Sequence, residues 1–165
     1  MTMIHSNAPF APQTPAQGPY RIDANNVMKH FKDKRFDLRE QTIAHDTSLA
    51  NLFCVIEVNI LDCTQAHFEK GALTPYLECL DLVEVYLDFT AVTDADLSPI
   101  QFQFDQLKVV SLQGCDLLTD KCLRFFESFK EGITLNLAQT KISKSAIQAF
   151  CENHPYVIIF TGENL

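Results

Sequence analysis

The sequence lacks tryptophan, and its five glycines stand singly rather than in a glycine-rich loop. It contains none of the spacings G-x-S-x-G, G-x-x-x-x-G-K-[ST], G-x-G-x-x-G or H-E-x-x-H. These patterns mark nucleophile elbows, phosphate-binding loops, dinucleotide sites and zinc hydrolases. We therefore expect a protein that is not an enzyme and that holds no cofactor.

Positive charge is also scarce, with 13 Lys and Arg against 21 Asp and Glu and a formal net charge of −8. Proteins that bind nucleic acid need clustered Lys and Arg to contact phosphates, so we expect no nucleic-acid partner. No apolar run reaches the roughly 18 residues of a membrane helix. The N-terminus has no basic region followed by an apolar one, which predicts no secretory signal and a cytoplasmic protein.

Six cysteines are present, and their positions favour buried thiols over disulfides. Cys63 and Cys115 follow apolar alternating segments, and the others that we place lie among apolar residues: Cys79, Cys122 and Cys151. Such thiols indicate a reducing compartment. The Cys-His spacings at Cys63 and Cys151 fall short of the four convergent ligands that zinc needs, so we expect no metal site. An enzyme using a thiol or a metal remains the weaker alternative.

One segment organises the rest of the chain: residues 107–123, LKVVSLQGCDLLTDKCL, read L-x-x-V-x-L-x-x-C followed by x-x-L-T-D-x-x-L. Similar alternations recur on both sides. Their first two core positions are Phe36 and Leu38, Val58 and Ile60, Val85 and Leu87, Val110 and Leu112, Leu135 and Leu137, and Ile158 and Phe160. Successive units are 22, 27, 25, 25 and 23 residues apart. This spacing is typical of leucine-rich repeats.

The pattern in residues 107–123 resembles the cysteine-containing leucine-rich repeats found behind F-box domains. The resemblance implies an α/β fold, a short right-handed horseshoe of five to six parallel strands with a helical or irregular convex side. In that family the repeats serve as substrate receptors of ubiquitin ligases, as assembly factors, or as injected bacterial effectors. Nothing in the first 50 residues resembles an F-box.

Three parts of the chain differ in composition. Residues 1–20 carry four prolines and predict a flexible, extended tail. The tail is either passive, a docking peptide for a proline-reading domain, or an unstructured export signal. Residues 21–34 predict a capping helix in which Asp23 precedes an apolar stripe. Residues 35–165 form the predicted repeat domain.

Function in a repeat fold is expected on the strand residues that point away from the core. We predict that a protein partner, of basic or mixed charge, binds these residues: Arg35, Asp37, Arg39, Glu57, Asn59, Glu84, Tyr86, Asp88, Ser111, Gln113 and Asn136. Leu61, Val109, Thr134 and Ala138 are expected beside them on the same face. The alternative is a solvated face without a partner.

Two features remain open from the sequence. Phe89 belongs either to the core or to the surface, and if exposed it forms an apolar spot beside Tyr86. The last strand, with Ile158 and Phe160 expected in the core, presents an uncovered edge. A homodimer through this edge is a further hypothesis.

Overall fold

The computed structural model describes residues 21–103, 105–129 and 132–162, and within these ranges the protein is a mixed α/β fold. The predicted tail at residues 1–20 lies outside the described residues. The main sheet has the strand order β10-β9-β8-β7-β5-β3-β2. Its strands are β2 (Phe31–Lys32), β3 (Arg35–Asp37), β5 (Ile60–Asp62), β7 (Glu84–Tyr86), β8 (Val109–Ser111), β9 (Thr134–Asn136) and β10 (Ile158–Phe160). All neighbours are parallel except β2 and β3, so the expectation of an α/β fold with parallel strands is confirmed.

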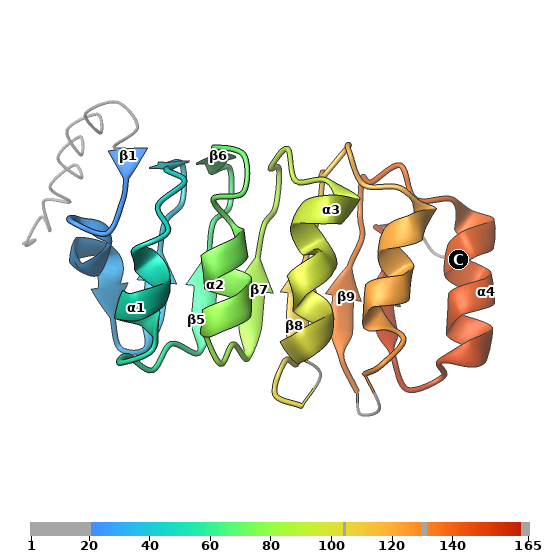
Figure 1. The fold of residues 1–165 in the computed structure, drawn as a ribbon. Helices are drawn as coiled ribbons and strands as arrows, with labels where there is room; N and C mark the ends of the chain where they lie inside the picture. The colour runs from blue at the N-terminus through green and yellow to red at the C-terminus, as the bar shows by residue number, and fades with distance from the viewer. Residues whose placement is uncertain (1–20, 104, 130–131, 163–165) are drawn as a thin grey trace, which may run out of the picture.

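A smaller parallel sheet lies beyond the ends of the first strands. It contains β1 (Arg21–Ile22), β4 (Thr42–Ile43) and β6 (His67–Phe68), in the order β1-β4-β6. These strands are short, and Figure 1 shows β1 and β6 at one edge of the molecule.

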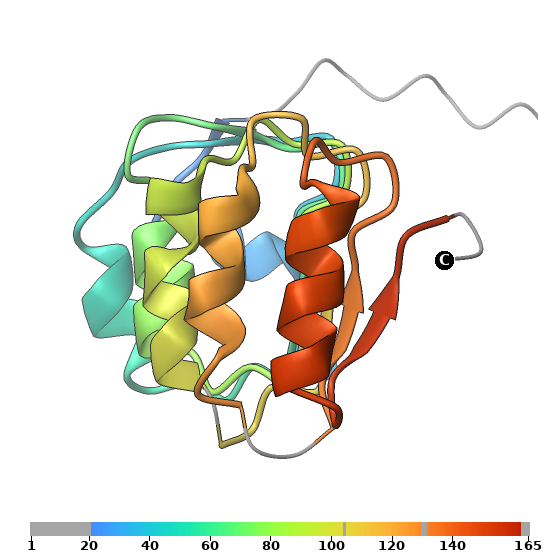
Figure 2. The ribbon, with the colours of Figure 1, turned by 90° about the vertical axis from the view of Figure 1, so that its right-hand side faces the viewer.

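The helices form a second layer on one face of the main sheet (Figures 1 and 2). They are α1 (Leu49–Phe53), α2 (Thr74–Cys79), α3 (Asp94–Leu97), the 3-10 helices η2 (Ser98–Gln103) and η3 (Asp120–Phe126), and α4 (Lys144–Asn153). Figure 2 shows the strands on the other side, with no helix of the described residues over their outer face. The segment expected to be a capping helix, residues 21–34, is helical only at η1 (Val27–His30), a 3-10 helix between β1 and β2.

The core lies between the two layers and is built around one aligned position in each strand. Strand register places the following residues side by side: Phe36, Leu61, Val85, Val110, Leu135 and Ile159. All are fully buried except Ile159, which packs against the core while partly buried. The intervals between them are 25, 24, 25, 25 and 24 residues, more regular than the intervals inferred from the sequence.

Register corrects two expectations. In β5, Leu61 rather than Val58 aligns with Val85, so Leu61 points inward and Ile60 outward. Val58 is also buried, but it precedes the strand. The sequence offers two overlapping alternations here, and the backbone uses the later one.

The second correction concerns β10, where Ile158 and Phe160 were expected in the core. They are instead 55% and 57% exposed, whereas Val157 is buried. A shift of one residue exchanges the two faces of a strand, because side chains alternate along it. Four apolar residues in succession, Val157 to Phe160, left that shift undetermined.

The turns that follow β3, β5, β7, β8 and β9 each contain a residue with positive φ. These residues are Glu40, Gln65, Phe89, Gly114 and Gln139, each four positions after the aligned core residue. The parallel hydrogen bonding continues here: Phe89 N donates to Gln113 O at 2.7 Å, and Gly114 N donates to Ala138 O at 2.8 Å. The main-chain pairing therefore extends from the strands into these turns.

Short polar side chains join the starts of neighbouring helices. Ser143 caps α4 by accepting from Ala146 N at 3.2 Å. Asp120 accepts from Ser143 N at 2.7 Å, and this bond lowers the pKa of the Asp120 carboxyl. Asp94 accepts from Thr119 N at 2.9 Å in the same way. Both carboxylates thus have a structural task.

Candidate interaction surface

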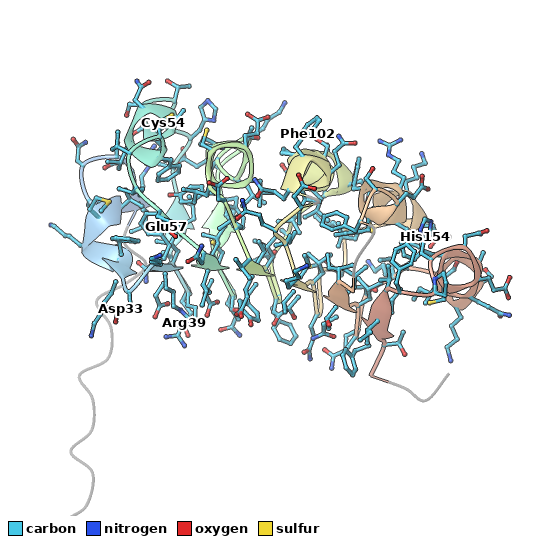
Figure 3. All side chains as sticks on the ribbon, turned by 90° about the horizontal axis from the view of Figure 1, so that it is seen from below. Asp33, Arg39, Cys54, Glu57, Phe102 and His154 are labelled. Carbon is cyan, nitrogen blue, oxygen red and sulfur yellow. The ribbon has the colours of Figure 1, made fainter. Side chains whose placement is uncertain are left out.

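Strand residues that point away from the helices form what we call the open face. They alternate with the aligned core residues and comprise Arg35, Asp37, Ile60, Asp62, Glu84, Tyr86, Val109, Ser111, Thr134, Asn136, Ile158 and Phe160. Figure 3 shows side chains, Arg39 among them, extending from the strands on the side opposite the helices. The character of this face changes along the strand order.

The part on β3 and β5 we call the charged half, consisting of Arg35, Asp37, Arg39, Ile60 and Asp62. Its charges satisfy one another. Arg35 Nη2 donates to Asp62 Oδ2, although Asp62 is only 7% exposed. Arg39 donates through Nε and Nη2 to the two oxygens of Asp37, at 2.7 and 2.6 Å.

In both ion pairs the charge of each side chain is balanced by that of its partner. Hydrogen bonding from Arg39 holds the pKa of the Asp37 carboxyl below its usual range, and Asp37 keeps the pKa of Arg39 raised. Asp62 also accepts from Thr64 Oγ1 at 2.8 Å. A partner that used these groups would first have to compete with bonds already made.

Glu57 and Asn59, two predicted site residues, precede β5 instead of lying on it. Glu57 is exposed and pairs with Lys34 Nζ at 2.6 Å. The main-chain oxygen of Asn59 accepts from Val83 N and Glu84 N. The outward positions of β5 belong to Ile60 and Asp62, which the sequence interpretation did not assign to the surface.

The boundary lies at β7, with Glu84, Tyr86 and the following Asp88. Tyr86 Oη donates to Glu84 Oε2 at 2.8 Å. Burial and this hydrogen bond raise the pKa of Tyr86 to about 12, so its hydroxyl stays protonated near neutral pH. Asp88 Oδ1 accepts from Gln113 N at 2.9 Å and thereby orders the turn after β8.

The part on β8, β9 and β10 we call the uncharged half, because it contains no Asp, Glu, Lys or Arg. Its residues are Val109, Ser111, Gln113, Thr134, Asn136, Ala138, Ile158 and Phe160. Asn136 Nδ2 donates to Ser111 Oγ at 3.0 Å, and Asn136 Oδ1 accepts from Ala138 N at 3.2 Å. The centre is thus small and polar, and the border at β10 is apolar and exposed.

Phe89 lies at the rim of the open face, just after β7, and is 47% exposed. Its φ of 57° is a left-handed conformation that bulky residues rarely adopt. The ring packs over Gly114: a Cβ built on Gly114 would lie 2.7 Å from Phe89 Cε1. The glycine therefore makes room for an aromatic ring that the core does not contain.

The predicted site residues thus fall into separate groups. Arg35, Asp37 and Arg39 belong to the charged half, whereas Ser111, Gln113 and Asn136 belong to the uncharged half. Ile158 and Phe160 were missed because their apolar side chains were assigned to the core. The sequence left Phe89 open, and its place in a turn is seen only in the structure, from its positive φ.

Three of the cysteine thiols are buried and unreactive. Cys63, Cys115 and Cys122 are buried, and burial raises the pKa of all three thiols, that of Cys122 to about 12. Cys54 is exposed, in contrast to the expectation of buried thiols, and all six cysteines are free. Among the described residues, no three His, Cys, Asp or Glu side chains gather as metal ligands would.

Helices in the described part of the chain are too short and too polar to cross a lipid bilayer. No protein-family model matches the sequence, and no curated protein matches it. The geometry of the open face is therefore the basis on which its function is inferred.

Proposed function

We propose that this protein is a non-enzymatic interaction module of the leucine-rich repeat type, a short horseshoe whose open face binds a protein partner. Aligned core residues at intervals of 24 or 25 support the repeat assignment. Parallel strands in one layer and helices in the other fit the same architecture.

The single observation that carries the binding proposal is the contrast along the open face. In the charged half, Arg35 and Asp62, and Arg39 and Asp37, pair within the chain. In the uncharged half, Ile158 and Phe160 are more than half exposed. Apolar and aromatic side chains contribute most where a partner removes them from water. This contrast supports a partner site on the uncharged half and the adjoining β7.

Phe89 supports this location. A bulky residue with positive φ costs on the order of 1–3 kcal/mol, a strain that functional sites commonly retain. The equivalent turns use Glu40, Gln65, Gly114 and Gln139, so the fold has no need of an aromatic ring here. Tyr86 on β7 and Phe89 in the turn after it give this end of the surface two aromatic side chains.

The chemistry of the partner follows from what borders these anchors. Glu84 and Asp88 flank Tyr86, and their carboxylates accept hydrogen bonds from Tyr86 Oη and Gln113 N. A partner with apolar side chains at its centre and basic side chains at its rim fits this arrangement. Rim charges then set the rate and orientation of association more than its strength.

The test compares two variants that each add one arginine. Thr134→Arg places it at the centre of the uncharged half, and Ala149→Arg places it on exposed α4, behind the sheet. We expect the natural chain and Ala149→Arg to capture a protein from a lysate of the cells that produce this chain. Thr134→Arg should fail to capture it.

Circular dichroism and the melting temperature show whether both variants remain folded. Equal recovery of the captured protein by both folded variants would contradict the proposed surface. Loss with Ala149→Arg alone would move the interface to the helical layer.

A further inference from the structure

The outer edge of β10 is an unpaired strand edge among the described residues, since β10 ends the strand order. Ile158 N donates to Ile133 O at 2.9 Å, and Phe160 O accepts from Leu137 N at 2.7 Å. Both residues thus direct their main-chain groups toward β9. Because these groups alternate along a strand, Ile159 directs its N–H and C=O away from β9. One donor and one acceptor on the same residue face outward.

We propose that the protein forms a two-fold symmetric dimer in which β10 pairs antiparallel with β10 of a second copy, centred on Ile159. In an antiparallel pair, two residues that face each other in a hydrogen-bonded position exchange both N–H···O bonds. Ile159 facing Ile159 of the second copy meets this condition without a change in either strand. The edge is therefore complementary to itself, as an isologous interface requires.

The side chains agree with this register. With Ile159 on the axis, Ile158 lies opposite Phe160 of the second copy, and Phe160 lies opposite Ile158 of the second copy. These are non-hydrogen-bonded positions, where side chains approach most closely. Ile158 and Phe160, 55% and 57% exposed in one chain, would bury each other in an apolar cluster of four side chains.

Charge does not oppose a second copy at this edge. The chain carries a formal net charge of −8, which makes self-association unfavourable at most of its surface. From Asn153 to Gly162, however, there is no Asp, Glu, Lys or Arg. Protected strand edges usually carry charged side chains, often lysine, that oppose pairing. β10 lacks them, so two acidic chains can meet here without bringing carboxylates together.

The two-fold axis is normal to the sheet, so both copies keep their helices on the same side. The uncharged halves of the two open faces then become continuous across the axis. The dimer buries the β10 side chains whose exposure also supports the partner surface, and it leaves β7, β8 and β9 to the partner. The two tests stay distinguishable, because the dimer test changes Ile159 and Phe160, whereas the partner test changes Thr134.

The experiment measures the mass of the full chain by analytical ultracentrifugation over a range of concentrations. We expect a monomer–dimer equilibrium in the natural protein. Phe160→Asp places a carboxylate against the apolar cluster and should raise the dissociation constant by about tenfold or more. Phe102→Asp is the matched control, because Phe102 is 70% exposed on η2, in the helical layer.

Ile159→Pro tests the backbone separately. Proline removes the outward N–H but none that donates to β9, and strand edges accept it in this position. It should abolish the dimer while the monomer stays folded by circular dichroism. A monomer at every concentration, or a dimer weakened equally by Phe102→Asp, would overturn the proposal. So would a dimer that both β10 variants leave intact.

A mixing experiment tests the register. Ile158→Cys and Phe160→Cys are made on a Cys54→Ser background, because Cys54 is exposed. Opposed non-hydrogen-bonded residues lie at a Cα separation that a disulfide spans. Mild oxidation of the mixture should cross-link the two variants to each other. Cross-linking of either variant alone to the same extent would overturn the pairing centred on Ile159.

Discussion

The charged and uncharged halves of the open face share one backbone design and differ in what their side chains leave available. Both rest on the same aligned core, with Leu61 in one half and Val110 in the other fully buried. In the charged half, Arg35 bridges from β3 to Asp62 on β5. In the uncharged half, neighbouring strands are joined by the weaker contact from Asn136 to Ser111.

This difference separates stability from recognition. Side chains that face inward must be apolar to hold the two layers together. Side chains that face outward are free of that demand, so one half uses them to join strands and the other leaves them exposed. The comparison predicts that core substitutions act alike in both halves and that surface substitutions do not.

The largest effect is expected in the core. Leu61→Ala in the charged half and Leu112→Ala in the uncharged half should each lower the free energy of unfolding by about 2–5 kcal/mol. Both side chains are fully buried, and truncation leaves a cavity. Urea unfolding measures the loss. Ile60→Ala is the control for the corrected register, and a loss as large as that of Leu61→Ala would contradict it.

A smaller effect distinguishes the two surfaces. Arg35→Ala removes the closer ion-pair partner of Asp62, which is 7% exposed, and leaves only Arg39 Nε at 3.8 Å. The substitution should cost roughly 1–3 kcal/mol because the carboxylate remains desolvated. Thr134→Ala, at an outward position of the uncharged half, should cost less than about 0.5 kcal/mol. Thermal unfolding compares the two variants, and equal costs would remove the distinction between the halves.

Phe89→Asn sharpens the functional side of the comparison. Asparagine tolerates positive φ better than phenylalanine, so stability should stay the same or rise by up to about 1 kcal/mol. Binding of the partner should weaken because an exposed aromatic anchor is lost. Melting temperature and pull-down are measured together. A clear drop in melting temperature with unchanged binding would assign Phe89 to folding instead.

The smallest effect depends on pH. The pKa of Asp37 is lowered in the folded state by Arg39, so its stabilising contribution is present above the unfolded pKa of about 4 and lost as pH falls through the folded value. Asp37→Asn should therefore be less stable at pH 7, by under about 1 kcal/mol because the pair is largely exposed. The difference from the natural chain should vanish near pH 2. Melting curves at both pH values check this, and a difference that persists in acid would exclude the ion pair as its cause.

The sequence was most informative where a unit contained a single alternation of apolar residues. Val85 and Leu135 were placed correctly in the core because residues with polar groups flank them on both sides. It failed at Leu61 and at Ile159, where adjacent apolar residues allow two registers. Register there depends on the neighbouring strand, which no single segment specifies.

The candidate surface was less predictable than the core. Tyr86, Ser111 and Asn136 were assigned to the open face from alternation alone, and the strands place them there. The pairing of Arg35 with Asp62, 27 residues apart, could not be read from the chain. Neither could the contact between Phe89 and Gly114, since both arise only when successive strands lie side by side.

By itself, then, the sequence determined that apolar residues recur about every 25 positions and that parallel strands and helices follow from them. Hydrophobic periodicity depends on the order of residues along the chain, so it can be recognised in the sequence alone. Only the tertiary structure decided which charges are already paired, which aromatic rings remain exposed and which strand edge is open. Those properties depend on contacts between units that lie far apart in the chain, so the sequence alone does not specify them.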